Sequence, residues 1–339
     1  SLSSTFPVAV GPDLTHNGAR DAFVAKVKAD GSGFDYCGYI GGSGDDYGYG
    51  IAVDGTGNAY LAGKTASNQT SFPVATGPDL TFNGGLADAF VARVKADGSR
   101  LDYCGYIGGN GTDYGNGIAV DGAGNAYIAG TTSSNEASFP DGDGFGPLGG
   151  PDTTYGGGLG DGFIAKVKAD GSGLDYCGYI GGSDWDESTS VAINGAGNAY
   201  VTGFTFSDQS TFPVTTGPDL SHNGGEDAFV AKIKADGSGF DYCGYIGGID
   251  NDIGYGIAVD GAGDAYIAGY TKSTEASFPL IVGPDLTHNG DEDAFVAKVS
   301  EGPQDSDGDG VPDATDNCPN TFNPGQEDND GDGMGDVCD

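Results

Sequence analysis

The chain is built from one segment that recurs along its length. The stretch Ala22 to Gly42, AFVAKVKADGSGFDYCGYIGG, returns almost unchanged from Ala89, Gly162 and Ala228, and a partial copy begins at Ala294. The phenylalanine at the second position of each copy recurs at spacings of 67, 73, 66 and 66 residues. This near-constant spacing indicates one structural unit whose differences in length are confined to loops. Such units bury, by stacking on their neighbours, apolar faces that a single unit would leave exposed.

Each unit is predicted to contain four short β-strands. In the second unit these are residues 50–54, 59–63, 89–95 and 101–107. The glycines of the DGTGN turn between the first two strands supply the positive φ that a tight hairpin needs. The chain holds 66 glycines, which disfavour long helices and favour turn-rich β structure. The prediction is an all-β fold of antiparallel four-stranded units, the arrangement of a propeller blade.

The strands do not divide evenly into units. The chain has four copies of strands one and two, five copies of strand three and four copies of strand four. It opens with strands three and four, and no fourth strand follows Ser300. Two arrangements are consistent with this count. A ring could close within one chain by borrowing the strand near Tyr36, or the ends of two molecules could complete each other, because unpaired strand edges invite added strands.

The repeat resembles a known family. GIAVDGxGNAY, T-x-SFP, DAFVAKVKADGS and DYCGYIGG are similar to the bacterial β-propeller repeats of large secreted and surface proteins. The resemblance covers about residues 5–300 and implies a propeller-like fold and an exported location, but no particular activity. We therefore expect residues 1–302 to form a β-propeller-like domain of four full-repeat equivalents plus an extra strand, and residues 303–339 to form a separate small module.

That C-terminal module carries the strongest chemical signal in the sequence. Two twelve-residue loops, 305–316 and 328–339, place acidic residues at alternate positions around a glycine at position 6. Alternate positions of a turning loop direct oxygen atoms to one point, and a hard cation such as Ca²⁺ takes six to eight oxygen ligands. The predicted ligands are Asp305, Asp307, Asp309, the Val311 carbonyl, Asp313 and Asp316 in the first loop, and Asp328, Asp330, Asp332, the Met334 carbonyl, Asp336 and Asp339 in the second.

The same segment resembles the thrombospondin type 3 repeat through DxDxDGxxDxxDNCPxxxNPxQxDxDxDGxGDxCD. The resemblance implies bound calcium and a disulfide between Cys318 and Cys338, which match the paired cysteines of that family. An acidic disordered tail is the alternative, but such a tail would not place Gly and Cys in register twice.

Composition excludes several classes of partner. Lys and Arg number 13 against 50 Asp and Glu, a formal net charge of −37, so the chain repels nucleic acid phosphates and anionic lipids and attracts divalent cations. No stretch approaches the roughly 20 apolar residues of a membrane helix. We interpret the polar start at Ser1 as that of a secreted protein, extracellular or on the cell surface, whose signal peptide has been removed.

The histidines and the repeat cysteines are predicted to be structural. His16, His222 and His288 share one repeat position with Phe82 and Tyr155, which could not replace a metal ligand or a general base. The strand-four cysteines are predicted to be small buried residues, too far apart for disulfides, with their role otherwise open; they are Cys37, Cys104, Cys177 and Cys243. The chain is therefore predicted not to be an enzyme.

Two further sets of charged residues recur with the repeat. One aspartate per unit is predicted in the loop before strand one, where it could accept backbone hydrogen bonds or bind calcium or sugar hydroxyls; these are Asp46, Asp113, Asp186 and Asp252. Nine of the thirteen basic residues lie in strand three, and alternation predicts that pairs such as Lys232 and Lys234 share one solvated face.

Three classes of function follow from these features. The first is a calcium-stabilised structural or adhesive surface protein that self-associates, as a homo-oligomer or as a head-to-tail filament. The second is a carbohydrate-binding propeller with surface glycans as partners. The third is an exported hydrolase or lyase, for which the loop Asp184 to Glu187, with the only tryptophan, is the one asymmetric candidate.

Overall fold

In the computed structural model of the chain, the structure describes residues 6–300, 311, 315–330 and 332–339. In these residues it contains seventeen strands in five antiparallel sheets and no helix. The first sheet has two strands, β1 (Ala22–Val27) and β2 (Phe34–Ile40). Three four-stranded sheets follow: β3 (Asp46–Val53), β4 (Ala59–Thr65), β5 (Asp88–Val94) and β6 (Leu101–Ile107); β7 (Asp113–Val120), β8 (Ala126–Thr132), β9 (Asp161–Val167) and β10 (Leu174–Ile180); β11 (Asp186–Ile193), β12 (Ala199–Thr205), β13 (Asp227–Ile233) and β14 (Phe240–Ile246). The last sheet has three strands, β15 (Asp252–Val259), β16 (Ala265–Thr271) and β17 (Asp293–Val299).

The predicted four-stranded unit is confirmed. Within every sheet the strands lie in chain order, each paired with the next by an antiparallel hairpin. The predicted strands 101–107 and 59–63 match β6 and the first part of β4. Strand one begins earlier than predicted, at Asp46 rather than Gly50. The reason is that Asp46 pairs with Thr65 of the neighbouring strand, a contact that the local pattern does not contain.

The core of the body lies between successive sheets. Strand one of each sheet packs on strand one of the next, so that β3 contacts β7, β7 contacts β11 and β11 contacts β15. One core cluster combines Ala62 and Val91 of one sheet with Ile128 and Phe163 of the next, all fully buried. Each unit therefore buries its apolar residues mainly by covering its neighbour.

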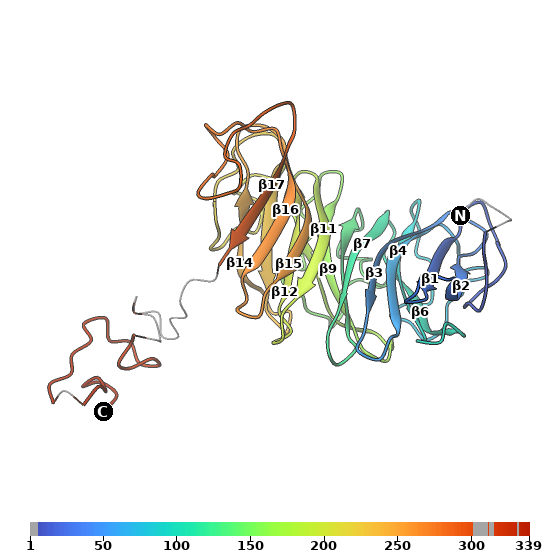
Figure 1. Ribbon diagram of the computed structural model, residues 1–339, viewed down its shortest axis with the longest axis horizontal. Coiled ribbons are helices and arrows are strands. Elements are labelled where there is room, and N and C mark those ends of the chain that lie inside the picture. The colour runs from blue at the N-terminus through green and yellow to red at the C-terminus, as the bar shows by residue number, and fades with distance from the viewer. Residues whose placement is uncertain (1–5, 301–310, 312–314, 331) are drawn as a thin grey trace.

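The stack of sheets is open. The two-stranded sheet β1–β2 and the three-stranded sheet β15–β17 lie at opposite ends of the molecule (Figure 1), and the sheets do not close into a ring. The arrangement in which β2 completes the last unit of its own chain is therefore not the one observed. The last unit keeps three strands, with β17 as its outer edge.

The four strand-four cysteines are free and buried, as predicted. No helix in the described residues is long and apolar enough to cross a membrane.

Candidate functional site

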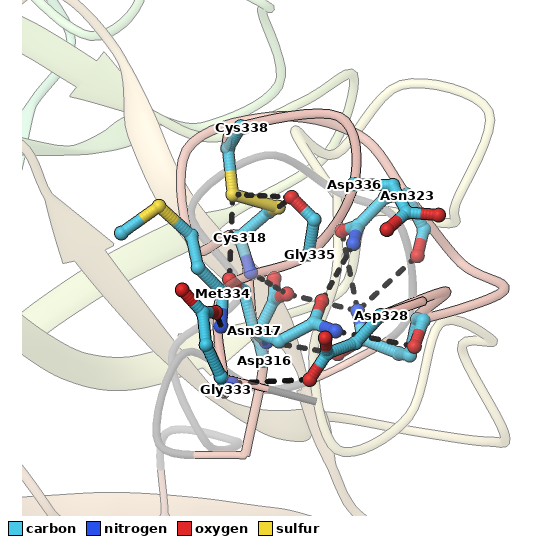
Figure 2. Close-up of a disulfide and its surroundings, with 12 residues drawn as sticks. Asp316, Asn317, Cys318, Asn323, Asp328, Gly333, Met334, Gly335, Asp336 and Cys338 are labelled. Carbon is cyan, nitrogen blue, oxygen red and sulfur yellow. Dashed lines mark hydrogen bonds between the residues drawn. A yellow bond between two sulfur atoms is a disulfide. The ribbon is translucent and has the colours of Figure 1, made fainter. Parts of the chain in front are cut away.

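The second predicted calcium loop brings three of its carboxylates together. Oxygen atoms of Asp328, Asp330 and Asp332 all lie within 4.8 Å of one another. The loop turns at Gly333, which has a φ of 94° and donates its N–H to Asp328 Oδ2 at 3.0 Å (Figure 2). The N–H of Met334 is donated to Asp332 Oδ1 at 2.8 Å. These bonds hold the carboxylates toward one point, which is how a loop prepares an oxygen site for a hard cation.

The other two predicted carboxylates of this loop, those of Asp336 and Asp339, are not part of that cluster. Asp336 instead accepts the N–H of Asn329 at 2.9 Å and a second hydrogen bond from the Asn329 side chain. Met334, whose carbonyl is the sixth predicted ligand, is exposed and follows the cluster in the chain. The structure therefore groups three of the five carboxylates predicted for this loop.

The first predicted loop lies mostly outside the described residues. Asp305, Asp307, Asp309 and Asp313 are not described, whereas Val311 and Asp316 are. Oδ1 of Asp316 accepts the N–H of Cys318 at 2.7 Å and a side-chain N–H of Gln326 at 2.8 Å. This carboxylate therefore links the two halves of the module.

The disulfide expected between Cys318 and Cys338 is present. Around it, amide side chains form a network that the sequence reasoning did not identify. Asn317 receives a hydrogen bond from Asn323 at 2.7 Å and donates its own N–H to Gln326 Oε1 at 2.9 Å. The signal was available in the run NCPNTFNPGQ, because four amide side chains in a ten-residue loop are typical of a polar framework. The module is thus organised by one covalent bond and hydrogen bonds rather than by an apolar core.

The residues of the second loop fit a calcium ion. Asp330 and Asp332 are exposed and Asp328 is half-buried, so three negative charges converge near the surface, where an ion can enter. Three hard oxygen donors with room for water and carbonyl ligands match the preference of Ca²⁺. The chemistry available here is ion binding and loop ordering.

The prediction that the strand-one aspartates lie in the loop before the strand is wrong. They are the first residues of β3, β7, β11 and β15, and each is at most 1% exposed. Asp113 accepts hydrogen bonds from Thr132 Oγ1, from Ser134 Oγ at 3.0 Å and from the N–H of Gly109 at 2.9 Å. Of the two roles considered, this environment favours backbone and side-chain hydrogen bonding, because the carboxylate is closed to solvent ligands.

A second buried aspartate, at the start of strand three, was missed from the sequence. Asp88 is fully buried and accepts the N–H of Asn83 at 2.7 Å. A Cβ on Gly108 would lie 2.8 Å from Asp113 Oδ2 and 3.0 Å from Asp88 Cγ, so the two carboxyl groups flank this glycine. Burial, with the nearby Asp113 charge adding to it, raises the pKa of Asp88 to about 8. The recurrence of Asp before every AFVAK copy was the available signal.

The histidine position is a packing position, as predicted. The rings of His16 and His222 lie 5.7 Å from the rings of Tyr39 and Tyr245. The equivalent rings pack in the same way: Phe82 lies 6.0 Å from Tyr106, and Tyr155 lies 5.8 Å from Tyr179.

The prediction of a solvated lysine face is wrong for Lys232. This side chain is 7% exposed, its Nζ lies 3.3 Å from Asp241, and it also lies over the ring of Tyr200 at 5.6 Å. Both partners belong to the same sheet as Lys232, Tyr200 in β12 and Asp241 in β14, and the alternation pattern of a single strand does not show this burial. Lys26, in the first sheet, is 3.6 Å from Asp35 and stays exposed.

Side chains of the Asp184 to Glu187 loop contact residues in and beside the neighbouring strands. Trp185 stacks on Phe206 with ring centres 5.9 Å apart and meets Phe204 edge-on. Glu187 accepts a hydrogen bond from the Asn116 side chain at 3.1 Å, and burial raises its pKa. The absence of enzymatic activity stays a prediction.

Tyrosines gather around one lysine where the second and third sheets meet. Nζ of Lys64 lies 4.1 Å from the ring centre of Tyr114 and 5.1 Å from that of Tyr47. Tyr47 and Tyr49 stack with centres 6.0 Å apart, and Tyr49 is 49% exposed. We call these four residues the tyrosine–lysine cluster; it presents aromatic rings to solvent.

Three segments of the chain match a family model described as a beta-propeller repeat: residues 36–69, 104–136 and 242–275. Each match begins in strand four of one unit and continues through strands one and two of the next. With the five antiparallel sheets, these matches support a β-propeller repeat protein whose sheets are not closed into a ring. They do not extend to residues 303–339, so the thrombospondin type 3 resemblance stays a prediction.

No curated protein matches the chain. Among the matching solved structures is a protein of unknown function from Dyadobacter fermentans DSM 18053, with 12% sequence identity and a TM-score of 0.37. The match covers 70% of this chain and 61% of that protein, so the chain spans less than two thirds of its length.

Proposed function

We propose that this chain is a secreted or cell-surface structural or adhesive protein, stabilised by calcium, which associates end to end with further copies and has no enzymatic activity. The observation that carries the proposal is the apolar surface exposed at both ends of the open stack. Val296 in β17 is 60% exposed, whereas its equivalents Val91 and Val230 in inner sheets are fully buried. Phe23 in β1 is 49% exposed, whereas its equivalent Phe90 is fully buried.

The apolar residues exposed at the two ends are of the same types as those that form the contacts between sheets inside the stack. Inner sheets cover the same residue types at the same register positions, so a sheet from another copy offers a matching surface. Exposed apolar patches with such a pattern are typical of interaction sites. A head-to-tail contact between unlike ends that does not close produces a filament.

Calcium supports this assembly in two ways. An ion held by Asp328, Asp330 and Asp332 would order the C-terminal loop, which lacks an apolar core. Divalent cations would also reduce repulsion between chains that each carry a formal charge of −37.

The assembly is tested by sedimentation velocity and electron microscopy of the purified chain with calcium and with a chelator. We expect large species with calcium that dissociate on chelation. Val296→Lys should abolish them, because it places a charge in the end surface, whereas Leu159→Lys, at an exposed loop position of an inner unit, should not. A chain that stays monomeric under both conditions would contradict the proposal.

Calcium binding is tested by titration calorimetry on the full chain. We expect two or more ions per chain with dissociation constants on the order of 10⁻⁴ to 10⁻³ M, as in extracellular modules. The combined change Asp328→Asn, Asp330→Asn and Asp332→Asn should remove one ion. A matched variant with Asp97→Asn, Asp170→Asn and Asp236→Asn removes the same charge from exposed turns, and this variant should still bind that ion. Equal uptake by both variants would show that the cluster is not the site.

A carbohydrate-binding function is the alternative, and the tyrosine–lysine cluster is the observation that favours it. Exposed tyrosine rings stack on sugar faces, and the hydroxyl and ammonium groups can bind sugar oxygens. A glycan array would show selective binding that Tyr49→Ala removes while leaving the sedimentation behaviour unchanged.

A further inference from the structure

Every complete unit holds its fourth strand between two backbone edges. One edge is strand three of the same sheet, and the other is the segment before each GPD motif. In the second unit, Ala75 N–H is donated to Cys104 O at 3.0 Å, Cys104 N–H to Thr76 O at 2.9 Å and Tyr106 N–H to Asp79 O at 2.8 Å. On the other side, β6 pairs with β5 through Cys104 opposite Ala92. The same two-sided pairing recurs around Cys37 and Cys243.

Among the residues that the structure describes, the last unit has both edges and no strand between them. The edge of β17 is the outermost of its sheet. The opposite edge is formed by Ile281, Val282 and Asp285, which correspond to Ala75, Thr76 and Asp79. Ile281 and Val282 are 88% and 90% exposed. We call the space between these two edges the open strand slot.

The open strand slot also keeps the aromatic contact that receives a strand-four tyrosine. In the second unit Tyr106 packs on Phe72 at 5.5 Å, and its hydroxyl donates to Ser67 O at 2.9 Å. The corresponding Phe278 already lies 5.2 Å from Phe295, as Phe72 lies 5.3 Å from Phe90.

A glycine contact adds a steric requirement. A Cβ on Gly77 would lie 2.6 Å from the Gly105 Cα, so segment and strand approach each other through two glycines. Gly217 and Gly244 repeat this approach at 2.8 Å. In the last unit a Cβ on Gly283 would meet only Leu286 Cδ2 at 3.2 Å and Asp285 O at 3.6 Å, so the space for a partner glycine is open.

We propose that the open strand slot binds a strand-four segment, of the type D-Y-C-G-Y-I, from a second copy of this chain. Four filled examples in the same molecule define the occupant: a backbone that bonds on both sides, a glycine opposite Gly283 and a tyrosine over Phe278. The chain after Ser300 reads EGPQDSDGDG and has neither the tyrosines nor this glycine spacing. The copy in β2 is the readiest donor, because its sheet has only two strands and lies at the opposite end of the stack (Figure 1). To enter the slot, β2 exchanges its pairing with β1 and the segment 9–13 for the equivalent pairing with β17 and the segment 281–285.

The inference deepens the proposed end-to-end association and rests on it for the identity of the donor. The slot itself is tested with a fluorescent peptide of residues 239–248 with Cys243→Ser, added to the full chain in chelator, where no second copy fills the slot, and followed by anisotropy. We expect saturable binding of one peptide per chain. Peptides carrying Gly244→Val or Tyr245→Ala should bind at least tenfold more weakly.

On the protein side, Gly283→Val should abolish peptide binding, because its side chain fills the space for the incoming glycine. The variant should fold normally, since the same position in the unfilled unit meets few atoms; an unchanged circular dichroism spectrum and melting temperature check this. Failure of the peptide to bind the unchanged chain, or equal binding to the unchanged chain and to Gly283→Val, would contradict the proposed slot.

The two proposals fail in different ways. A chain that assembles with calcium but binds no peptide would leave the end-to-end association standing and overturn the slot. A chain that binds the peptide but stays monomeric at every calcium concentration would support the slot as a binding site for a strand-four segment. It would contradict both the filling of the slot by a second copy and the proposed assembly.

Discussion

Single aspartates determine how each unit begins its first strand. Asp113 is buried and receives hydrogen bonds from two hydroxyl groups and one backbone N–H. Asp88 lies across Gly108 from it, so each junction between strands four and one encloses two carboxyl groups. Two like charges this close and this deeply buried are costly, so the folded unit favours protonation of one of them.

The stability of the body should therefore increase as the pH falls from 8 to 5. Burial raises the pKa of Asp88 and Asp161 to about 8 and that of Asp227 to about 7, above the unfolded value of about 4. Between these values the folded state holds protons that the unfolded state has released, so the free energy of unfolding decreases as the pH rises. Thermal melts across this range should show the highest melting temperature at the acidic end.

A matched variant separates this effect from the general repulsion of a chain with many acidic groups. Asp88→Asn, Asp161→Asn and Asp227→Asn together remove the three titrating groups and should flatten the pH dependence. The changes Asp97→Asn, Asp170→Asn and Asp236→Asn, at exposed positions, remove the same number of charges. They should leave the pH dependence of stability unchanged. An equal slope in both variants would mean that the buried carboxyl groups are not the cause.

Within each sheet, strand one carries a bulge, and strand two carries a glycine opposite it. In the third unit the register of β7 on β8 shifts between Gly115 and Gly117. A Cβ on Gly130 would lie 1.9 Å from Tyr114 O and 2.6 Å from a ring atom of Phe163. The bulge and the ring beneath it therefore leave room only for glycine.

Gly130→Ala should lower the free energy of unfolding by about 1 to 3 kcal/mol, as overpacking of a well-packed site does. Urea denaturation followed by tyrosine fluorescence would measure the change. Gly122→Ala is the control, because a Cβ there meets no atom within 4 Å; it should change the stability by less than about 0.5 kcal/mol. Similar midpoints for the two variants would contradict the role of the bulge.

Across the whole molecule, position in the stack decides how well a strand is covered. β13 (DAFVAKI) and β17 (DAFVAKV) have almost the same sequence, but every residue of β13 is buried, whereas β17 alternates between exposed and covered residues. β13 also has a paired strand on each side, whereas among the described strands β17 has one partner, β16. Local stability should therefore decrease toward the ends of the stack.

Hydrogen exchange measured by mass spectrometry would test this gradient. Peptides containing β13 should exchange far more slowly than peptides containing β17. Their nearly identical sequences give nearly identical intrinsic rates, so the difference reports the structure. Equal protection would indicate that the last unit is covered in solution, for instance by another copy.

The repeat, the four-stranded unit, most strand positions and the packing role of the histidine position could be predicted from the sequence. These follow from patterns within one unit, such as alternation along a strand or the turn residues of DGTGN. The pairing of Cys318 with Cys338 was implied by the resemblance of the C-terminal segment to a known repeat. Of the five carboxylates predicted to bind calcium in the second loop, three converge, and Asp336 bonds to Asn329 instead.

The burial of Asp46 and its equivalents, the burial of Lys232 and the open form of the stack could not be predicted from the sequence. Each depends on contacts between separate strands or sheets: Asp113 accepts hydrogen bonds from Thr132 and Ser134 across a strand pair, and Lys232 lies over Tyr200 of the neighbouring strand. Ring closure depends on the angle between packed sheets, summed over every junction. That angle is fixed by how whole sheets fit together, and no single repeat encodes it.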